Sequence, residues 1–144
     1  MHVSRVSVFM KCSVVIRAYN EAKDIGRLLE GIRQQNLAEI EIILVDSGST
    51  DKTVSIAESY DAKIVHISPD EFTFGRSLNY GVRAASGEFI VNVSAHCYPV
   101  YPDWLAELLK PFDDENLAIS YGKQRGGETN QYSEHQFFRQ YFPD

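Results

Sequence analysis

The hydrophobic residues of this chain gather in short runs rich in β-branched side chains, and more polar segments separate the runs. Each run is apolar at almost every position, which is typical of strands covered on both faces in a parallel sheet. The pattern predicts five strands, at residues 12–16, 40–45, 63–67, 89–93 and 117–121.

The segments between the runs carry apolar residues at intervals of three and four, the spacing that lines one face of a helix. The clearest example consists of Ile25, Leu28, Leu29 and Ile32. A second helix is predicted over residues 51–60, with Ser49 or Thr50 as its N-cap. Its inward-facing residues are expected to be Val54, Ala57 and Tyr60.

Two more helices are predicted further along the chain. The first covers residues 76–85, with Leu78, Val82 and Ala85 on its inner face, and Gly87 ends it as a C′ glycine. The inner face of the second is expected to consist of Trp104, Leu105, Leu108 and Leu109, between Pro102 and Pro111. The order βαβαβαβαβ predicts an α/β fold with a doubly wound, mostly parallel sheet, right-handed crossovers and helices on both faces.

A chain of 144 residues, 44% of them hydrophobic, has the size of one compact domain, so we interpret residues 1–144 as a single domain. Its 14 basic and 20 acidic residues give a net charge of −6, which argues against a nucleic acid as the partner. The sequence has neither the ~20 apolar residues of a membrane helix nor a secretory signal pattern, so we expect a cytoplasmic protein. Cys12 and Cys97 are interpreted as buried thiols.

The composition changes after Gly122. Residues 122–131 are polar, and the aromatic residues that follow lie on one helical face with little chain left to cover them. These aromatic residues are Phe137, Phe138, Tyr141 and Phe142. We interpret residues 122–144 as a polar loop followed by an aromatic C-terminal helix, an incomplete part of the domain that offers a surface for self-association.

In an open α/β sheet, ligands bind beyond the carboxyl ends of the strands, where the strand order reverses. The loops expected there, residues 17–21, 46–51 and 94–98, are rich in hydrogen-bonding groups. The chain has no Gly-x-Gly-x-x-Gly and no P-loop, which argues against dinucleotide oxidoreductases and P-loop NTPases, and no Gly-x-Ser-x-Gly elbow. Side chains would have to hold a nucleotide, with Asp46 accepting from a base or ribose and Tyr19 stacking on the base.

Three segments carry motifs that are recognisable together. They are residues 13–21 (Ser-Val-Val-Ile-x-Ala-Tyr-Asn-Glu), 43–53 (Ile-Leu-Val-Asp-Ser-Gly-Ser-Thr-Asp-Lys-Thr) and 79–90 (Asn-x-Gly-x3-Ala-x-Gly-Glu-Phe-Ile). In this order and spacing they resemble family 2 glycosyltransferases of the GT-A fold. The runs at residues 46–49 and 121–124 look closest to the bacterial rhamnosyltransferase-like branch of that family.

The resemblance implies an enzyme that transfers a sugar from a nucleoside-diphosphate sugar to a hydroxyl of a saccharide or lipid-linked acceptor, with inversion. It further implies cell-envelope or exported-polysaccharide synthesis, in the cytoplasm or peripherally at the inner face of the cell membrane. By motif position, the expected donor-binding residues are Ala18, Tyr19, Glu21, Asp46, Ser47, Arg76, Asn79 and Ser94. A guanidinium such as that of Arg76 suits a diphosphate because its planar donors pair with phosphate oxygens.

The sequence departs from the family at the metal motif. The family has Asp-x-Asp after the fourth strand, whereas this chain has Ser94-Ala95-His96. His96 stands at the position of the direct ligand, and Mn²⁺ accepts imidazole more readily than Mg²⁺ does. A divalent metal, Mn²⁺ or Mg²⁺, is therefore expected to bind with low affinity or to be held largely by the phosphates of the donor.

A second departure concerns the catalytic base, for which the sequence nominates no residue. The family supplies this carboxylate from a segment beyond the equivalent of residues 121–122, and the resemblance therefore predicts that the base lies outside the present chain. Carboxylates are available at Asp103, Glu128 and Glu134, but none matches the family motif.

Simpler structural roles compete with several of these functional roles. Asp46 is interpreted as a ligand rather than a cap because it stands at the end of a strand, whereas Ser49, Thr50 and Asp51 are interpreted as helix caps. For His96 a metal ligand and a hydrogen-bonded loop histidine stay open as alternatives. The remaining histidines receive no role beyond packing or surface.

Two alternatives to a transferase remain at this stage. The chain could be a non-catalytic module that binds nucleotide sugars or a partner, which catalytic turnover by the purified chain would distinguish. It could also be a receiver-like domain with Asp46 as phosphoacceptor, although the acidic cluster that such a site needs is not evident.

The aromatic face near the C-terminus yields a first prediction. If Phe137, Phe138, Tyr141 and Phe142 form an uncovered helical face, the isolated chain should self-associate or be poorly soluble, because exposed apolar patches mark interfaces. Light scattering of the purified chain measures this, and a monodisperse monomer would count against it.

Overall fold

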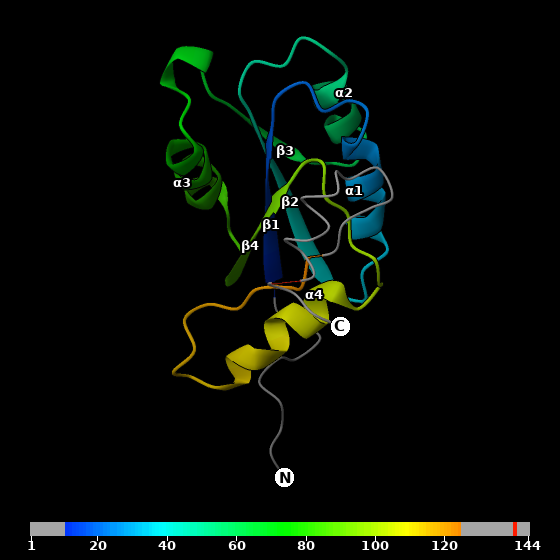
Figure 1. Ribbon diagram of the computed structural model, residues 1–144, viewed down its shortest axis with the longest axis vertical. Coiled ribbons are helices and arrows are strands. Elements are labelled where there is room, and N and C mark those ends of the chain that lie inside the picture. Colours follow the sequence, from blue (N-terminus) through cyan, green and yellow to red (C-terminus); the bar gives the residue numbers. More distant parts are fainter. Residues whose placement is uncertain (1–10, 125–139, 141–144) are drawn as a thin grey trace.

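The computed structural model describes residues 11–124 and residue 140, and its centre is a four-stranded sheet (Figure 1). The strands are β1 (Lys11–Ala18), β2 (Glu39–Asp46), β3 (Lys63–His66) and β4 (Phe89–Ser94). Their order is β3-β2-β1-β4, and all three neighbouring pairs are parallel. The parallel α/β fold predicted from the sequence is confirmed.

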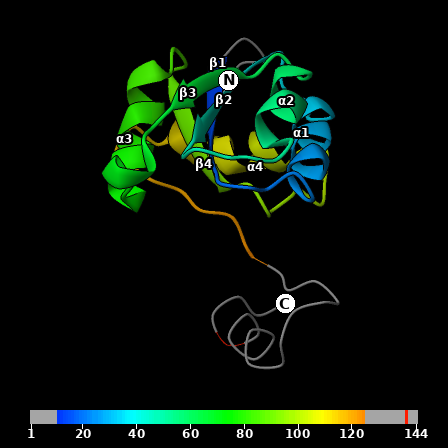
Figure 2. The same cartoon turned by 90° about the horizontal axis from the view of Figure 1, so that it is seen from above.

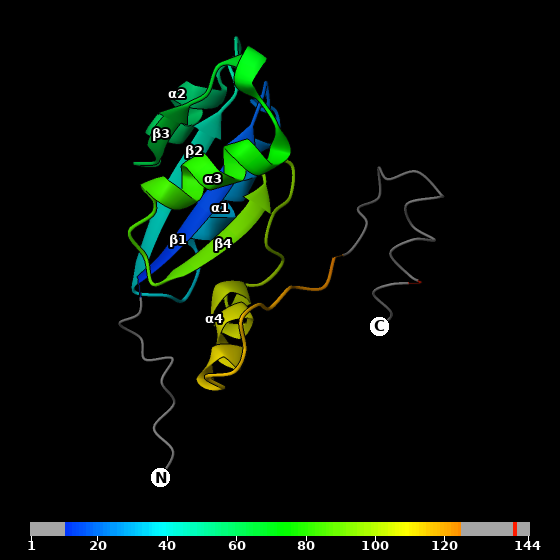
Figure 3. The same cartoon turned by 90° about the vertical axis from the view of Figure 1, so that its left-hand side faces the viewer.

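Helices cover both faces of the sheet (Figure 2). On one face lie α1 (Ile25–Arg33) and α2 (Thr53–Glu58), and on the other lies α3 (Phe74–Ala84). The short helix α4 (Trp104–Leu109) lies near the amino ends of the strands (Figure 3). Two 3₁₀ turns complete the list, η1 (Pro69–Glu71) and η2 (Lys110–Asp113).

The core consists of two apolar clusters, one on each face of the sheet. The larger one joins the four predicted residues of α1, all fully buried, to alternate residues of β1 and to Leu105 and Leu109 of α4. The smaller one joins Val15, Ile43, Val45 and Ile67 to partly buried residues at the C-terminal end of α3, Ala84 and Ala85. Because β1 contributes to both clusters, its near-continuous apolar run is explained by burial on both faces.

The predicted inner face of α3 is wrong. Ser77 and Gly81 are its buried residues, whereas Val82 is 40% exposed and Leu78 is only partly buried. The small side chains let the helix approach the sheet closely, since a Cβ at position 81 would lie 2.3 Å from Val15. A prediction from apolar periodicity assigns the large apolar residues to the inner face, so it misses a contact that small residues make.

The predicted caps also differ from the structure. The N-cap of α2 is Lys52, so neither Ser49 nor Thr50 caps that helix. Gly87 is not a C′ glycine, because α3 ends at a C-cap in extended conformation at Ala85. Gly87 is needed for close approach instead, since a Cβ there would lie 2.7 Å from the backbone nitrogen of Ser13 on β1.

The segment Leu117–Tyr121, predicted as a fifth strand, forms no strand. No strand within residues 11–124 pairs with it, and Ile119 and Tyr121 are 77% and 83% exposed. One hydrogen bond, from the Ser120 hydroxyl to the Leu108 carbonyl, ties it to α4. A segment rich in β-forming residues therefore forms no strand when no neighbouring strand is available to pair with it. The predicted aromatic C-terminal helix lies outside the described residues.

The two cysteines differ in environment. Cys12 is buried in β1 as predicted, and burial raises the pKa of its thiol to about 11. Cys97 is exposed, so the prediction of a second buried thiol is wrong.

A polar clasp joins β1, β2 and the turn before β4 at the amino ends of the strands. The carboxylate of Glu41 accepts hydrogen bonds from the Ser13 hydroxyl and from the backbone N–H and hydroxyl of Ser86. Lys11 donates to the same Ser86 hydroxyl. Partial burial acts to raise the pKa of Glu41, but these hydrogen bonds and the charge of Lys11 outweigh it and lower the pKa to about 2.

The loop after β4 is docked onto α1 by two contacts. Pro99 packs on Gly31, where a Cβ would lie 2.7 Å from the proline Cγ. The guanidinium of Arg27 stands 3.5 Å from the centre of the Tyr98 ring. Helix α1 therefore determines where residues 94–99 lie.

The Glu41 clasp should make the stability of the fold depend on pH. The pKa of Glu41 is about 2 in the fold, against an ordinary value of 4.5, so its contribution is complete above pH 4.5 and disappears as the pH falls towards 2. Because the carboxylate is partly solvated, Glu41→Gln should lower the free energy of unfolding at pH 7 by only about 1 kcal/mol. Urea denaturation at pH 7 and pH 3 measures this, with Glu39→Gln at an exposed position of the same strand as control. Equal losses in the two variants would contradict the clasp.

Replacement of Gly31 should loosen the docked loop. Alanine favours a helix over glycine by up to about 1 kcal/mol, and a Cβ at Gly26 of the same helix would meet Ile56 at an ordinary 3.8 Å. Gly26→Ala should therefore stabilise the fold, whereas Gly31→Ala should destabilise it because the new Cβ displaces the proline. The free energies of unfolding of the two variants should differ by about 1–2 kcal/mol. Thermal unfolding of both variants tests the contact. Equal stabilisation by the two would show that Pro99 does not rest on Gly31.

Candidate functional site

The strand order reverses beside β1, because the chain proceeds from β1 through β2 to β3 and then returns to place β4 on the other side of β1. The loops that follow β1 and β4 leave neighbouring strands at the carboxyl edge of the sheet, where ligands bind in open α/β sheets. The sequence-predicted residues Glu21, Ser94 and His96 all lie on or beside these two loops.

Those three residues are brought together. His96 Nδ1 lies 3.5 Å from Glu21 Oε1, and the Ser94 hydroxyl lies 3.2–3.3 Å from the two ring nitrogens of His96. The His96 side chain is 62% exposed and that of Glu21 is 26% exposed, so the group is open to solvent. An imidazole, a carboxylate and a hydroxyl thus meet where the two loops lie side by side.

The group fits a divalent metal in part. Within the described residues, no cluster of three or more His, Cys, Asp or Glu side chains could hold a metal ion alone. His96 and Glu21 nevertheless offer two ligand types that Mn²⁺ accepts, and the Ser94 oxygen is close to the imidazole. The donor set fits an ion that takes most of its ligands from phosphate oxygens and water.

Cys97 follows this group directly but is not prepared for nucleophilic chemistry. Partial burial of the sulfur, together with the nearby Glu21 carboxylate, raises the pKa of the Cys97 thiol. A raised pKa keeps the thiol protonated and unreactive near neutral pH.

Hydrogen bonds join the loop after β1 to the loop after β2. The Asn20 side-chain oxygen accepts from the backbone N–H groups of Thr50 and Asp51, and the Ser49 hydroxyl accepts from Asn20 N–H. The Thr53 hydroxyl accepts from Glu21 N–H at 2.8 Å. Ser49 was predicted to be a helix cap, but its hydroxyl bonds the opposite loop instead. Asp51 accepts from the Thr53 N–H at the start of α2, as a cap does, and also from the opposite loop. Glu21 is therefore held in place by Thr53, the first residue of α2.

Asp51 links the two loops as well. One of its carboxylate oxygens accepts from Ala22 N–H, and the other accepts from the N–H and hydroxyl of Thr53. These hydrogen bonds lower the pKa of Asp51, and the bond from the Thr53 hydroxyl has the largest effect. Its charge therefore persists into moderately acidic conditions and keeps the loops joined.

Asp46 ends β2 with its side chain only 3% exposed. Its two oxygens accept from the backbone N–H groups of Gly48 and Ser49 at 3.1–3.2 Å. The residue is in register with Ala18 on β1 and with His66 on β3. His66 Nδ1 lies 3.6 Å from Asp46 Oδ2.

Three more of the expected donor-binding residues, Ala18, Tyr19 and Ser47, lie at or directly after the ends of β1 and β2. Ala18 is buried at the end of β1, and its carbonyl accepts from both the N–H and the hydroxyl of Ser47. Tyr19 follows with a ring that is 57% exposed, as a stacking surface requires.

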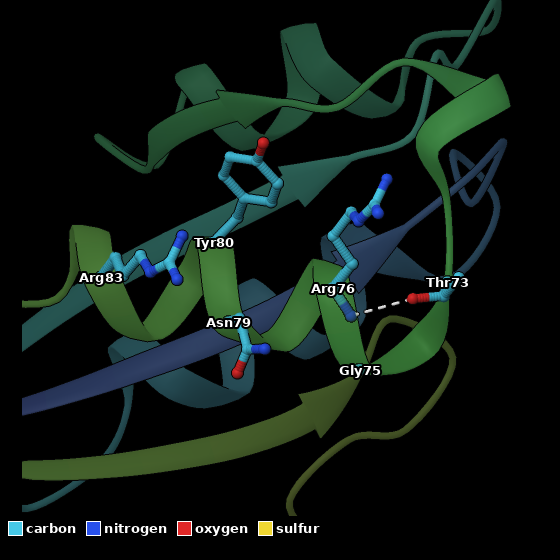
Figure 4. Close-up of a pocket in the computed structure, with 6 residues that line it drawn as sticks. All are labelled: Thr73, Gly75, Arg76, Asn79, Tyr80 and Arg83. Atoms are coloured by element: carbon cyan, nitrogen blue, oxygen red, sulfur yellow. Dashed lines mark hydrogen bonds between the residues drawn. The ribbon is translucent and has the colours of Figure 1, made fainter.

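Arg76 and Asn79 lie apart from this group. Both line a hollow of about 450 Å³ on the surface of α3, where Figure 4 shows their side chains pointing away from each other. The Arg76 guanidinium donates to the Glu71 carbonyl at 3.1 Å, which directs it towards η1. Neither side chain is linked to Glu21, Ser94 or His96 by a hydrogen bond in the described structure.

Sequence reasoning missed two residues that the site uses. It assigned His66 to packing or surface, although the strand register brings it to Asp46. It assigned no role to Asn20, which adopts a positive φ of 53° and accepts from the β2 loop. An asparagine directly after a strand was an available signal, since Asn tolerates this conformation.

Comparison with known proteins places the chain. The family model described as Glycosyl transferase family 2 matches residues 13–143. The O-antigen chain rhamnosyltransferase WbaN of Salmonella anatum is 35% identical over 85 residues, which cover 58% of this chain and 27% of WbaN. Against three further curated glycosyltransferases, the chain spans only 32%, 35% and 21% of their lengths.

Two solved structures share the fold. TarS 1–349 of Staphylococcus aureus in complex with UDP-GlcNAc aligns with a TM-score of 0.60 and 30% identity, over 71% of this chain and 32% of that one. The mannosyltransferase PcManGT of Pyrobaculum calidifontis in complex with GDP-Man and Mn²⁺ aligns with a TM-score of 0.62 and 28% identity, over 70% and 32%.

Within the described part of the chain, no helix combines the length and the apolar character needed to cross a bilayer. The family match runs from β1 almost to the last residue, and the parallel sheet with helices on both faces is shared with GT-A glycosyltransferases. The receiver-like alternative is therefore wrong, and the chain belongs to glycosyltransferase family 2.

Proposed function

We propose that this chain is the donor-binding domain, residues 1–144, of an inverting glycosyltransferase. It would take a nucleoside-diphosphate sugar and serve transfer to a saccharide or lipid-linked acceptor hydroxyl in cell-envelope or exported-polysaccharide synthesis. The proposed location is the cytoplasm or the inner face of the cell membrane. In support, WbaN is named for O-antigen chains and TarS is solved with UDP-GlcNAc.

The observation that carries the proposal is the Glu21–Ser94–His96 group at the strand-order reversal. It lies on the loops after β1 and β4, and Ala18, Tyr19 and Asp46 lie along the same edge of the sheet. A donor could therefore lie along this edge, with its base near β1 and β2 and its diphosphate near His96.

Each residue has a proposed task. Tyr19 stacks on the base, Ala18 and Ser47 form the backbone wall beside it, and Asp46 anchors the base end. Arg76 and Asn79, on α3, are proposed to face the donor, which requires Arg76 to leave the Glu71 carbonyl. His96 and Glu21 would hold a divalent cation, Mn²⁺ or Mg²⁺, which when bound neutralises the leaving diphosphate.

In an inverting transfer, the acceptor oxygen attacks the anomeric carbon as the bond to the diphosphate breaks, and a carboxylate takes the acceptor proton. Asp103 does not fit this task, because it directly precedes α4, which lies near the amino ends of the strands. Glu128 and Glu134 lie outside the described residues. The present residues therefore bind and orient the donor, and the base is proposed to lie in a segment beyond this chain.

The alternative is a non-catalytic module that binds nucleotide sugars. Sugar release from a bound donor, in the presence of acceptor, distinguishes a transferase from such a module.

Calorimetric titration of the purified chain with UDP, dTDP and GDP, with and without Mn²⁺, tests the donor site. We expect one nucleotide to bind more tightly with Mn²⁺, because His96 and Glu21 would hold the cation and the cation would neutralise the diphosphate. His96→Ala and Glu21→Gln should each reduce the Mn²⁺-dependent gain by about tenfold, equal to about 1.4 kcal/mol.

The control for this experiment is Cys97→Ser, which alters the same loop without removing an expected ligand. It should keep the full Mn²⁺ effect. Absence of nucleotide binding by a folded chain would overturn the donor site. Equal binding with and without Mn²⁺ in all variants would overturn only the metal assignment.

A further inference from the structure

Arg17 is a charged residue in β1, the most buried strand of the sheet. It stands between Ile16 and Ala18, at the position that the first sequence motif leaves open. Both of these neighbours are buried, whereas Arg17 is half-buried. An arginine in such a strand is costly unless an anion or hydrogen-bond acceptors compensate its charge.

The described part of the chain supplies no anion for this guanidinium. None of its carboxylates forms an ion pair with Arg17. The guanidinium lies instead over the ring of Phe74, with its Cζ 4.8 Å from the ring centre. A ring contacts the face of a guanidinium and leaves the N–H donors in its plane free. These donors therefore remain available to an anionic ligand.

The strand register places Arg17 beside Ser94. Arg17 of β1 and Ser94 of β4 are partners in a parallel pair. Partners on neighbouring strands lie about 5 Å apart and project from the same face of the sheet. Because side chains alternate along a strand, this is the face of Val15, which packs against Gly81 of α3. Arg17 is thus a cation on β1 directly next to the first residue of the segment 94–96.

That segment is short of positive charge for a diphosphate. Ser94 and Ala95 are uncharged, and the Glu21 carboxylate adds a negative charge 3.5 Å from His96. A leaving diphosphate must be neutralised, which a divalent metal does when it is bound. A guanidinium is permanently charged and pairs with two phosphate oxygens at once, so it can supply part of this charge from the chain itself.

The start of α3 holds the ring on which Arg17 rests. Phe74 is the first residue of that helix, and Thr73 caps it by accepting from Arg76 N–H. The rings of Phe72 and Phe74 pack edge to face with their centres 5.4 Å apart. Phe74 is nevertheless 69% exposed, so its contact with the guanidinium is not a by-product of a buried core.

We infer that Arg17 binds the diphosphate of the nucleotide-sugar donor and that Phe74 is the residue that positions it. The guanidinium donates to phosphate oxygens beside Ser94, and this contact does not depend on a metal at His96 and Glu21. The inference rests on the proposed function and adds a donor-binding residue with a fixed positive charge.

Calorimetric titration of the full chain with UDP, dTDP and GDP, in EDTA and in Mn²⁺, tests the role of Arg17. Arg17→Gln should weaken binding of the preferred nucleotide about tenfold in both conditions, because the fixed charge acts without a metal. Arg17→Lys keeps the charge but lacks the planar fork, so it should recover part of the loss. The matching nucleoside monophosphate should lose less affinity in Arg17→Gln than the diphosphate does.

Arg33→Gln is the matched control. The Arg33 guanidinium on α1 lies 5.6 Å from the centre of the Tyr60 ring, so the variant removes the same charge and a similar ring contact elsewhere in the molecule. It should bind the nucleotide as the wild type does. Circular dichroism and thermal unfolding establish that each variant is folded.

Phe74→Leu tests the positioning role without removing a charge. It should weaken nucleotide binding about threefold in the wild type but have no further effect in Arg17→Gln, because residues that act through one another are not additive. An equal loss in both backgrounds would contradict the positioning role of Phe74.

The outcomes separate this inference from the proposed function. A folded wild-type chain that binds none of the nucleotides, with or without Mn²⁺, overturns the donor site and the inference with it. Three results overturn only the role of Arg17: a loss in Arg17→Gln no larger than in Arg33→Gln, a loss confined to the Mn²⁺-dependent gain, or an equal loss for monophosphate and diphosphate. Should Arg17→Gln not fold, wild-type affinity in both Arg17→Lys and Phe74→Leu overturns that role.

Discussion

The structure depends on the burial of β1 between β2 and β4. This strand is the most buried of the four, contributes to both apolar clusters, and pairs with a parallel neighbour on each side. Because parallel strands end at the same edge, its central position brings the loops of the N-terminal half to the loop after β4. The contact between Glu21 and His96, 75 residues apart, is a direct consequence.

The sequence predicted those features that depend on strong local patterns. Four strands and the inner face of α1 were correct, because long apolar residues at strand or helix spacing determine what is buried. The predicted inner face of α3 failed because Ser77 and Gly81 make the contact, and neither stands out by hydropathy. The fifth strand failed because a strand requires a neighbour, which no local pattern supplies.

In the candidate site too, features that follow from local sequence patterns were predicted, and features that depend on contacts between distant segments were not. Motifs placed Glu21, Asp46 and Ser94 on the correct edge, since their positions follow from strand ends. They did not show that Asp46 would be buried by its own loop or that His66 would cover it, because both facts arise from register between strands. Ser49 was expected to cap a helix, but it bonds the β1 loop, and Asp51 bonds that loop in addition to Thr53 of α2. Both bonds to the β1 loop depend on how two distant segments meet.

The charges around the Glu21–Ser94–His96 group bear on how an anionic donor could be held. The chain has a net charge of −6, and three cationic side chains of the described region are already engaged. Arg17 lies over the Phe74 ring, Arg27 over Tyr98, and Arg76 donates to a carbonyl. The Glu21 carboxylate beside His96 would repel a diphosphate if the two met without an intervening cation. A divalent cation held by Glu21 and His96 would offset that repulsion, so this carboxylate disfavours binding of a diphosphate without a metal.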